Sequence, residues 1–84
     1  MGVTLGGEGL ALSAIKSSED GAWLVLRCVN LTDRAASGAW TLGSAAREAR
    51  ESRLDETPGE LVLIQDNRIA FTAPPRAIVT LLVR

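Results

Sequence analysis

The run Ala22–Asn30, "AWLVLRCVN", constrains the fold of this chain more than any other stretch. An extended strand divides alternate side chains between two faces, and in this run both faces are largely apolar. One face carries Leu24, Leu26 and Cys28, and the other carries Trp23, Val25, Arg27 and Val29. A strand of this kind needs cover on both sides. We therefore expect it inside a layered β structure, with its second face packed against something further.

The length of the chain limits it to one small domain. Its 84 residues are 46% hydrophobic and 23% charged, which is typical of a globular domain rather than a disordered segment. A chain of this size buries only about 60 to 65% of its unfolded surface, so its stability on its own is marginal. The small size therefore also favours a partner that covers part of the surface.

Short apolar runs, alternating or β-branched, recur along the chain between turn residues. The predicted strands are Leu10–Lys16, the run from Trp23, Ala36–Leu42, Leu61–Ile64, Ile69–Ala73 and Ile78–Val83. Polar turns favour a hairpin between the first two of these strands and another between the fourth and fifth. About six or seven short strands predict an all-β fold, a small antiparallel β-sandwich of the Ig-like kind. Glycine-rich residues 1–9 are expected to be a flexible leader or linker, and residues 10–84 to form the single sandwich domain.

Residues 44–56, "SAAREARESRLDE", are compatible with two structures. The Ala, Arg and Glu content favours a helix, with Ser44 as its N-cap. Leu54 is the only large apolar residue, however, so a helix here would have almost no face to bury. An edge strand with charged sides fits the same residues.

The charge balance and the length of the apolar runs argue against two classes of partner. Nine basic residues stand against ten acidic ones and are scattered, so we expect no nucleic-acid binding. No apolar run approaches the roughly 18 to 20 residues of a membrane span, so we expect no membrane contact. The single cysteine, Cys28, lies in an apolar strand and is expected to be a buried free thiol. A reducing, cytoplasmic location follows as the prediction.

The sequence offers little for catalysis. It contains no His and no Tyr, and no cluster of residues has metal-ligand spacing. Asp55 and Glu56 suggest a glycosidase pair, but adjacent strand residues point to opposite faces, whereas the chemistry needs two carboxylates that converge on one bond. We predict no catalytic residue, no metal site and no cofactor in this chain.

Two further features each have a structural and a functional interpretation. Asn30-Leu31-Thr32 matches a glycosylation sequon, although in a turn the match is more often a chance occurrence. Trp23 and Trp40 could form an aromatic platform for a sugar ring, but tryptophans in apolar strands are more often core residues. The exposure of these side chains decides between the alternatives.

Arg27 carries the one charge on the apolar run. An unpaired buried charge is expensive, so its guanidinium is expected to reach either water or a carboxylate. The structural interpretation is that the side chain snorkels at the edge of a sheet.

Several motifs occur in an order that resembles a known family. The segments "LALSAIKSSEDGAWLVLRCVNLTD", "RLDETP" and "FTAPPRAIVTLLV" resemble the C-terminal β-sandwich of glycoside hydrolase family 38 α-mannosidases. The matching stretches are Leu12–Lys16, Leu26–Asn30, Leu54–Pro58 and Pro75–Leu81. Cys28-Val29 departs from the apolar and aromatic residues that the family usually has there, and Asp55–Pro58 is looser than the usual acidic pair before proline.

The resemblance implies a non-catalytic accessory domain that packs against the catalytic part of an α-mannosidase and helps to shape its substrate cleft. The zinc or other divalent metal and the catalytic carboxylates would belong to that catalytic part, so this chain alone would be inactive. The resemblance also favours a strand over 47–54, and it makes Arg27 and Asn30 candidates for contact with the catalytic part. The alternative is a freestanding carbohydrate-binding or protein-interaction module.

The second apolar face predicts a docking surface. In a sandwich each sheet has one covered face, and the other is normally polar. If the Trp23 run and the C-terminal strand are neighbours, their outer residues form one apolar patch, which would dock on the parent enzyme or cause self-association. The patch would consist of Trp23, Val25, Ile78 and Leu82.

Overall fold

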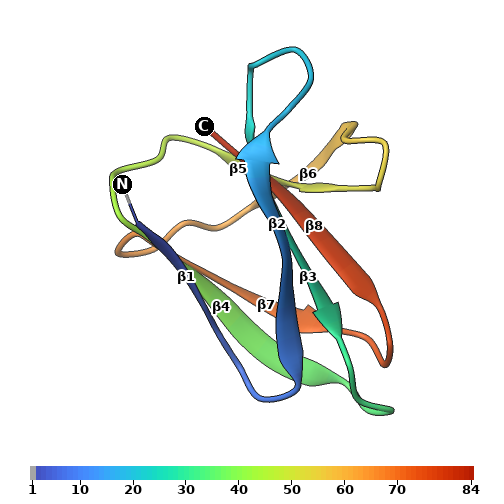
Figure 1. Ribbon diagram of the computed structural model, residues 1–84. Helices are drawn as coiled ribbons and strands as arrows, with labels where there is room; N and C mark the ends of the chain where they lie inside the picture. The colour runs from blue at the N-terminus through green and yellow to red at the C-terminus, as the bar shows by residue number, and fades with distance from the viewer. Residues whose placement is uncertain (1) are drawn as a thin grey trace.

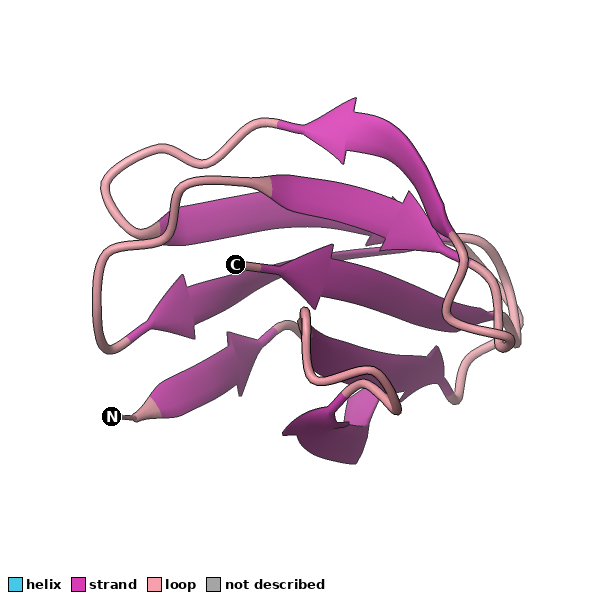
Figure 2. Cartoon of the chain, turned by 90° about the horizontal axis from the view of Figure 1, so that it is seen from above, coloured by secondary structure: helices cyan, strands magenta, loops and turns pink. Residues whose placement is uncertain are grey.

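The protein is a two-layer β-sandwich, described here by a computed structural model that covers residues 2–84 (Figure 1). Every regular element of these residues is a strand (Figure 2), which confirms the predicted all-β class. There are eight strands rather than six or seven. Their bounds are β1 Val3–Gly6, β2 Leu10–Ser17, β3 Leu24–Asn30, β4 Ala36–Leu42, β5 Ala49–Ser52, β6 Pro58–Val62, β7 Arg68–Ala73 and β8 Ile78–Val83.

The strands form one sheet of three strands and one of five, and all the pairs are antiparallel. The smaller sheet has the order β1-β4-β7, and the larger has the order β2-β3-β8-β5-β6. The predicted hairpin between the first two strands is confirmed, because β2 pairs with β3 from Leu10 opposite Asn30 to Ser17 opposite Leu24. β8 lies at the centre of the larger sheet, between β3 and β5.

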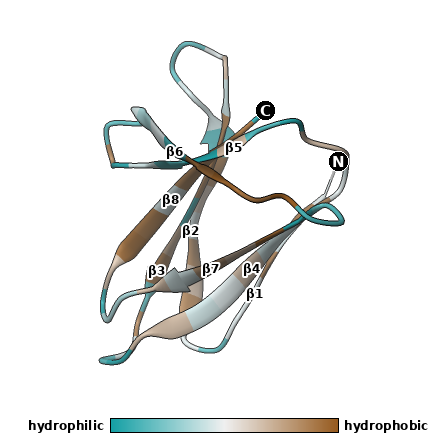
Figure 3. Cartoon of the chain, turned by 180° about the vertical axis from the view of Figure 1, so that it is seen from behind, coloured by the Kyte–Doolittle hydropathy of each residue, from teal (hydrophilic) through white to brown (hydrophobic). Residues whose placement is uncertain are grey.

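The core lies between the inner faces of the two sheets. Trp40 from the smaller sheet is its largest fully buried side chain, and Leu26 and Leu81 face it from the larger sheet. The hydrophobic colour of Figure 3 accordingly runs along β7 and β8, whereas turns between strands are mostly hydrophilic. The buried cluster comprises Leu26, Cys28, Trp40, Leu42, Ala49, Ile69, Leu81 and Val83.

The outer face of the larger sheet explains the second apolar face of the Trp23 run. There Val25 lies opposite Leu82, and Arg27 lies opposite Thr80. Val25 and Leu82 are fully buried and form a small second cluster with Trp23. The chain therefore covers part of this outer face by itself.

The expected flexible leader over residues 1–9 is wrong for Val3–Gly6, which forms β1; Met1 lies outside the described residues. β1 pairs with β4. Val3 and Leu5 lie on its inner face and pack against the core, whereas the residues between them face away from it. The glycines allow the chain to cross to the other sheet. Gly7 has a φ of 141°, and a Cβ there would lie 2.7 Å from the carbonyl oxygen of Ser37. The sandwich therefore begins before residue 10.

The ambiguous segment 44–56 contains a strand, as the family resemblance implied, and the helix alternative is wrong. β5 is shorter than the predicted strand over 47–54, and it is an inner strand between β8 and β6 rather than an edge. Ala49 explains why a strand forms here. Its small side chain is fully buried in the core, so this short strand is anchored by one inward residue and does not need a row of large apolar side chains.

The predicted hairpin between Leu61–Ile64 and Ile69–Ala73 is wrong, although its turn exists. Gln65 and Arg68 form an isolated antiparallel bridge around Asp66 and Asn67, which both have positive φ. Beyond this turn the strands separate, since β6 joins the larger sheet and β7 the smaller one. Val62 and Ile64 pack against the core on the way across.

Candidate functional site

Arg27, a predicted contact residue, is held by side chains and backbone of its own chain. Its Nε donates to Thr80 Oγ1 at 3.1 Å, and its Nη2 lies 3.8 Å from Glu56 Oε2. The same Glu56 oxygen lies 2.9 Å from Lys16 Nζ. The expectation that this charge reaches a carboxylate is confirmed. Snorkelling at a sheet edge is wrong, because β3 is an inner strand. Contact between Arg27 and another domain stays a prediction.

Asn30, the other predicted contact residue, is fully buried. Its Nδ2 donates to the carbonyl oxygens of Arg34, Ala73 and Pro74 at 2.8 to 3.2 Å. Its Oδ1 accepts hydrogen bonds from the backbone nitrogen and the hydroxyl of Thr32. Asn30 therefore joins the loops at one end of the sandwich, and a role in contact with another domain is wrong for it. The same burial leaves no access to the amide for a glycan.

The predicted docking patch is wrong for three of its four residues. Val25 and Leu82 are fully buried and Trp23 is 8% exposed, whereas Ile78 is 52% exposed. The guanidinium carbon of Arg84 lies 4.1 Å from the centroid of the Trp23 ring and covers it. The β2–β3 turn fixes the Trp23 backbone, whose nitrogen donates to Ser18 Oγ and whose carbonyl accepts from the Ser18 nitrogen.

The aromatic platform for a sugar ring is also wrong. Trp40 is fully buried in the core, and Trp23 is buried under Arg84. The indole Nε1 of Trp40 is the one buried side-chain donor without a hydrogen-bond partner among residues 2–84. Neither ring offers a face on which a sugar could stack.

The carboxylates that sequence reasoning considered for catalysis are engaged in contacts within the chain. Asp55 Oδ1 accepts a hydrogen bond from the Thr57 nitrogen at 3.0 Å, which lowers the pKa of Asp55. Glu56 pairs with Lys16 and Arg27. A glycosidase general acid needs a raised pKa. Burial raises the pKa of the Cys28 thiol, so this side chain is not activated as a nucleophile either.

A further charged group lies beside Trp23. Glu48 receives hydrogen bonds from Arg50 and Arg84, and these two contacts hold the pKa of its carboxyl below the usual range. Sequence reasoning missed this cluster. The alternation of strand residues places Arg50 on the outer face, but nothing in the pattern shows that Arg84 folds over Trp23.

Sequence reasoning also missed two side chains that point toward the core but are not covered. Leu12 lies opposite Cys28, and Ile15 lies opposite Leu26, so both face inward. They are nevertheless 58% and 41% exposed. Regular alternation would place these two residues on opposite faces, and nothing in the sequence reveals the register shift between Leu12 and Ala14 that brings them to the same one.

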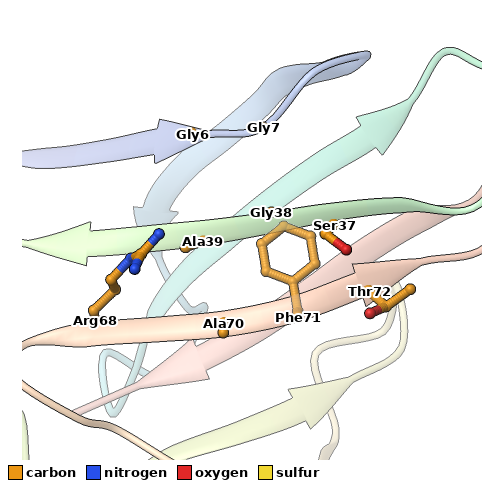
Figure 4. A pocket seen from close by; sticks show the side chains of 9 residues that line it. All are labelled: Gly6, Gly7, Ser37, Gly38, Ala39, Arg68, Ala70, Phe71 and Thr72. Atoms are coloured by element: carbon orange, nitrogen blue, oxygen red, sulfur yellow. The ribbon is translucent and has the colours of Figure 1, made fainter.

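A depression of about 570 Å³ lies over the outer face of the smaller sheet (Figure 4). Figure 4 shows Arg68 at one end of the depression and Ser37 and Thr72 at the other. Phe71 lies between them along β7, but its side chain packs against the core. Arg68 is the only charged residue among those that line it. The depression therefore has neither an acid nor a base for chemistry.

Residues 2–84 contain no group of three or more His, Cys, Asp or Glu side chains arranged to hold a metal ion. Over the same residues, no helix is long and apolar enough to cross a membrane.

The chain is thus a small antiparallel β-sandwich in which the carboxylates of Asp55 and Glu56 are engaged in contacts within the chain. Residues 9–81 match the family described as the C-terminal β-sandwich domain of family 38 glycosyl hydrolases. The chain belongs to this family, which confirms the resemblance in its sequence motifs. Searches of curated proteins and of solved structures gave no significant match.

Proposed function

We propose that the chain serves as a non-catalytic accessory domain of an α-mannosidase, where it packs against the catalytic part and helps to shape the substrate cleft. The match of residues 9–81 to the C-terminal domain of family 38 carries this proposal. The contacts of Asp55 and Glu56 support it, because both carboxylates are engaged within the chain. Asp55 accepts a hydrogen bond from the Thr57 nitrogen, and Glu56 pairs with Arg27. A cytoplasmic location is part of the proposal, supported by the buried free thiol of Cys28.

The test compares the glycosidase that contains this domain with a version from which residues 9–81 are deleted. An aryl α-mannoside is the substrate, and thermal unfolding is followed in parallel. We expect deletion to lower both activity and melting temperature, and the pure 84-residue chain to release no product. Hydrolysis by the pure chain would contradict the proposal, and so would a deletion variant with unchanged activity and melting temperature.

The alternative is a freestanding carbohydrate-binding module, and the burial of both tryptophans counts against it. Calorimetric titration of the 84-residue chain with mannose oligosaccharides separates the two functions. Saturable binding by the isolated chain would favour the alternative, and heats of dilution alone would favour the accessory domain.

A further inference from the structure

The loop between β5 and β6, residues 53–57, leans across the outer face of the larger sheet. β8 and β3 separate β5 from β2 in that sheet. Neighbouring strands lie about 4.8 Å apart, so roughly 14 Å separates β5 from β2. The loop nevertheless reaches both β2 and β3, because Glu56 Oε2 lies 2.9 Å from Lys16 Nζ and 3.8 Å from Arg27 Nη2. It therefore leans over β8 on the side that faces away from the core.

Val25 and Leu82 lie beneath this loop. Val25 is opposite Lys16 and two residues before Arg27, on the same face as both. The two partners of Glu56 therefore flank Val25. Leu82 is opposite Val25 on β8. Both apolar side chains point away from the core between the sheets, yet both are fully buried. The loop thus covers an apolar pair on a face that has no second sheet above it.

Charged side chains tie the loop to β2 and β3. Besides the two ion pairs of Glu56, the contact is a hydrogen bond of 3.5 Å from Arg27 Nη2 to the carbonyl oxygen of Leu54. Leu54 is the one large apolar residue of the loop, and its side chain is 61% exposed, so it provides little apolar anchorage. A hollow of about 350 Å³ lies between the loop and the β2–β3 turn. The attachment is therefore mainly electrostatic, whereas the sandwich is held by its apolar core.

The loop also has hydrogen bonds of its own that maintain its shape. The Glu56 nitrogen donates to the Arg53 carbonyl oxygen at 3.0 Å, and the Thr57 nitrogen donates to Asp55 Oδ1 at 3.0 Å. Neither bond involves β2 or β3. The loop can therefore lift from the sheet without breaking them, by rotation where β5 ends and β6 begins.

We infer that residues 53–57 form a strap that opens and closes over Val25 and Leu82 while the sandwich stays folded. Opening breaks the contacts of Glu56 and exposes two apolar side chains, so it requires less free energy than unfolding of the whole chain. Salt weakens the closed state, because the Debye length falls from about 10 Å at 0.1 M to about 3 Å at 1 M ionic strength. Ionic strength therefore controls how often this apolar pair meets solvent.

Labelling of two thiols with iodoacetamide tests the strap in the 84-residue chain. Val25→Cys places a thiol beneath the strap. The native Cys28 is fully buried on the inner face of the same strand, so its labelling reports unfolding of the sandwich. Trypsin cuts after Arg27, and mass spectrometry then reads the two labels on separate peptides. In urea below the unfolding midpoint, we expect position 25 to react at least about tenfold faster than Cys28.

The rate at position 25 should also depend on the charge of Glu56. We expect this rate, relative to that of free cysteine, to rise about threefold or more in about 1 M NaCl and in the added variant Glu56→Gln. Glu60→Gln, which neutralises an exposed carboxylate on β6, is the matched control and should leave the rate unchanged.

Two results would overturn the inference. If position 25 never reacts ahead of Cys28, both thiols become accessible only through unfolding of the sandwich. If Glu56→Gln or salt leaves the rate at position 25 unchanged, a motion other than that of the strap exposes it. Should Val25→Cys fail to fold, Leu82→Cys makes the same measurement from β8, where Leu82 lies opposite Val25.

Discussion

The guanidinium of Arg84 lies over the indole ring of Trp23, with 4.1 Å between the guanidinium carbon and the ring centroid. The same guanidinium lies 2.9 Å from Glu48 Oε1, so one side chain joins the β2–β3 turn to the residue that precedes β5. This contact covers Trp23, one of the four residues of the predicted docking patch, with a side chain of the same chain.

The first prediction concerns this contact. Arg84→Met keeps much of the side-chain length but removes the charge, and we expect a loss of about 0.5–1 kcal/mol in the free energy of unfolding. Trp23 should also become more accessible to a fluorescence quencher such as acrylamide. Arg68→Met, on the outer face of the other sheet, is the control and should change neither quantity. Unchanged quenching in Arg84→Met would contradict the prediction.

The second prediction concerns Asn30, whose amide nitrogen donates to three backbone carbonyls. Asn30→Asp keeps the shape but directs a carboxylate at those carbonyls, so we expect it to destabilise the chain by about 3 kcal/mol or more. Urea denaturation measures the change. Leu31→Ala, at an exposed neighbour, should stay within about 0.5 kcal/mol of the parent chain. Parental stability in the Asn30→Asp variant would show that the buried amide is not needed.

The third prediction separates the backbone of Glu56 from its charge. Glu56 has a φ of 64°, a left-handed conformation that favours glycine. Glu56→Ala and Glu56→Gly both remove the contacts with Lys16 and Arg27, so the difference between them reports the backbone alone. We expect the glycine variant to be more stable by about 0.5–1 kcal/mol in urea denaturation. An alanine variant of equal or greater stability would contradict a strained loop.

The fourth prediction concerns the loss of stability at acidic pH. Hydrogen bonds from Arg50 and Arg84 hold the pKa of Glu48 below its usual range, so the folded state binds this proton less readily than the unfolded state. The resulting stability is present above about pH 4.3, the ordinary value for glutamate, and is lost as the pH falls through the folded pKa. Asp20 and Asp55 also have lowered pKa values and act in the same direction.

Melting temperature against pH checks this sign. Glu48→Gln should be less stable than the parent chain at pH 7, and the difference should shrink toward pH 3, where the parent carboxyl is also neutral. Part of the acid dependence should remain in the variant, because Asp20 and Asp55 still titrate. A constant difference across the range would mean that Glu48 contributes through packing rather than charge.

Local patterning predicted much of the fold. The alternation from Leu10 and the apolar run after Trp23 predict β2 and β3, because no turn residue or helical pattern interrupts either run. The short strand β1 was missed. Four glycines among residues 1–9 indicate a flexible backbone, and the two apolar residues Val3 and Leu5 are too few to indicate a strand from local sequence alone. Its stability comes from pairing with β4, more than thirty residues away.

The candidate site was harder to predict than the fold. The sequence placed Arg27 on an apolar face and required water or a carboxylate for it, but the partner, Glu56, is brought there by a loop with a left-handed residue that no alternation signals. Trp23 is covered in the same way by Arg84, from the other end of the chain. In both cases the partner is a charged side chain from a distant segment, and hydrophobic patterns do not reveal such a partner.

The position of β8 has a consequence for synthesis on the ribosome. This strand is the last of the eight, yet it lies between β3 and β5 at the centre of the larger sheet. During translation β3 and β5 emerge with their facing edges unpaired, and the larger sheet forms only after residues 78–83 leave the exit tunnel. Nascent chains stalled before residue 78 should therefore be sensitive to protease and bind chaperones, and release of the last strand should convert them to the folded state in one step.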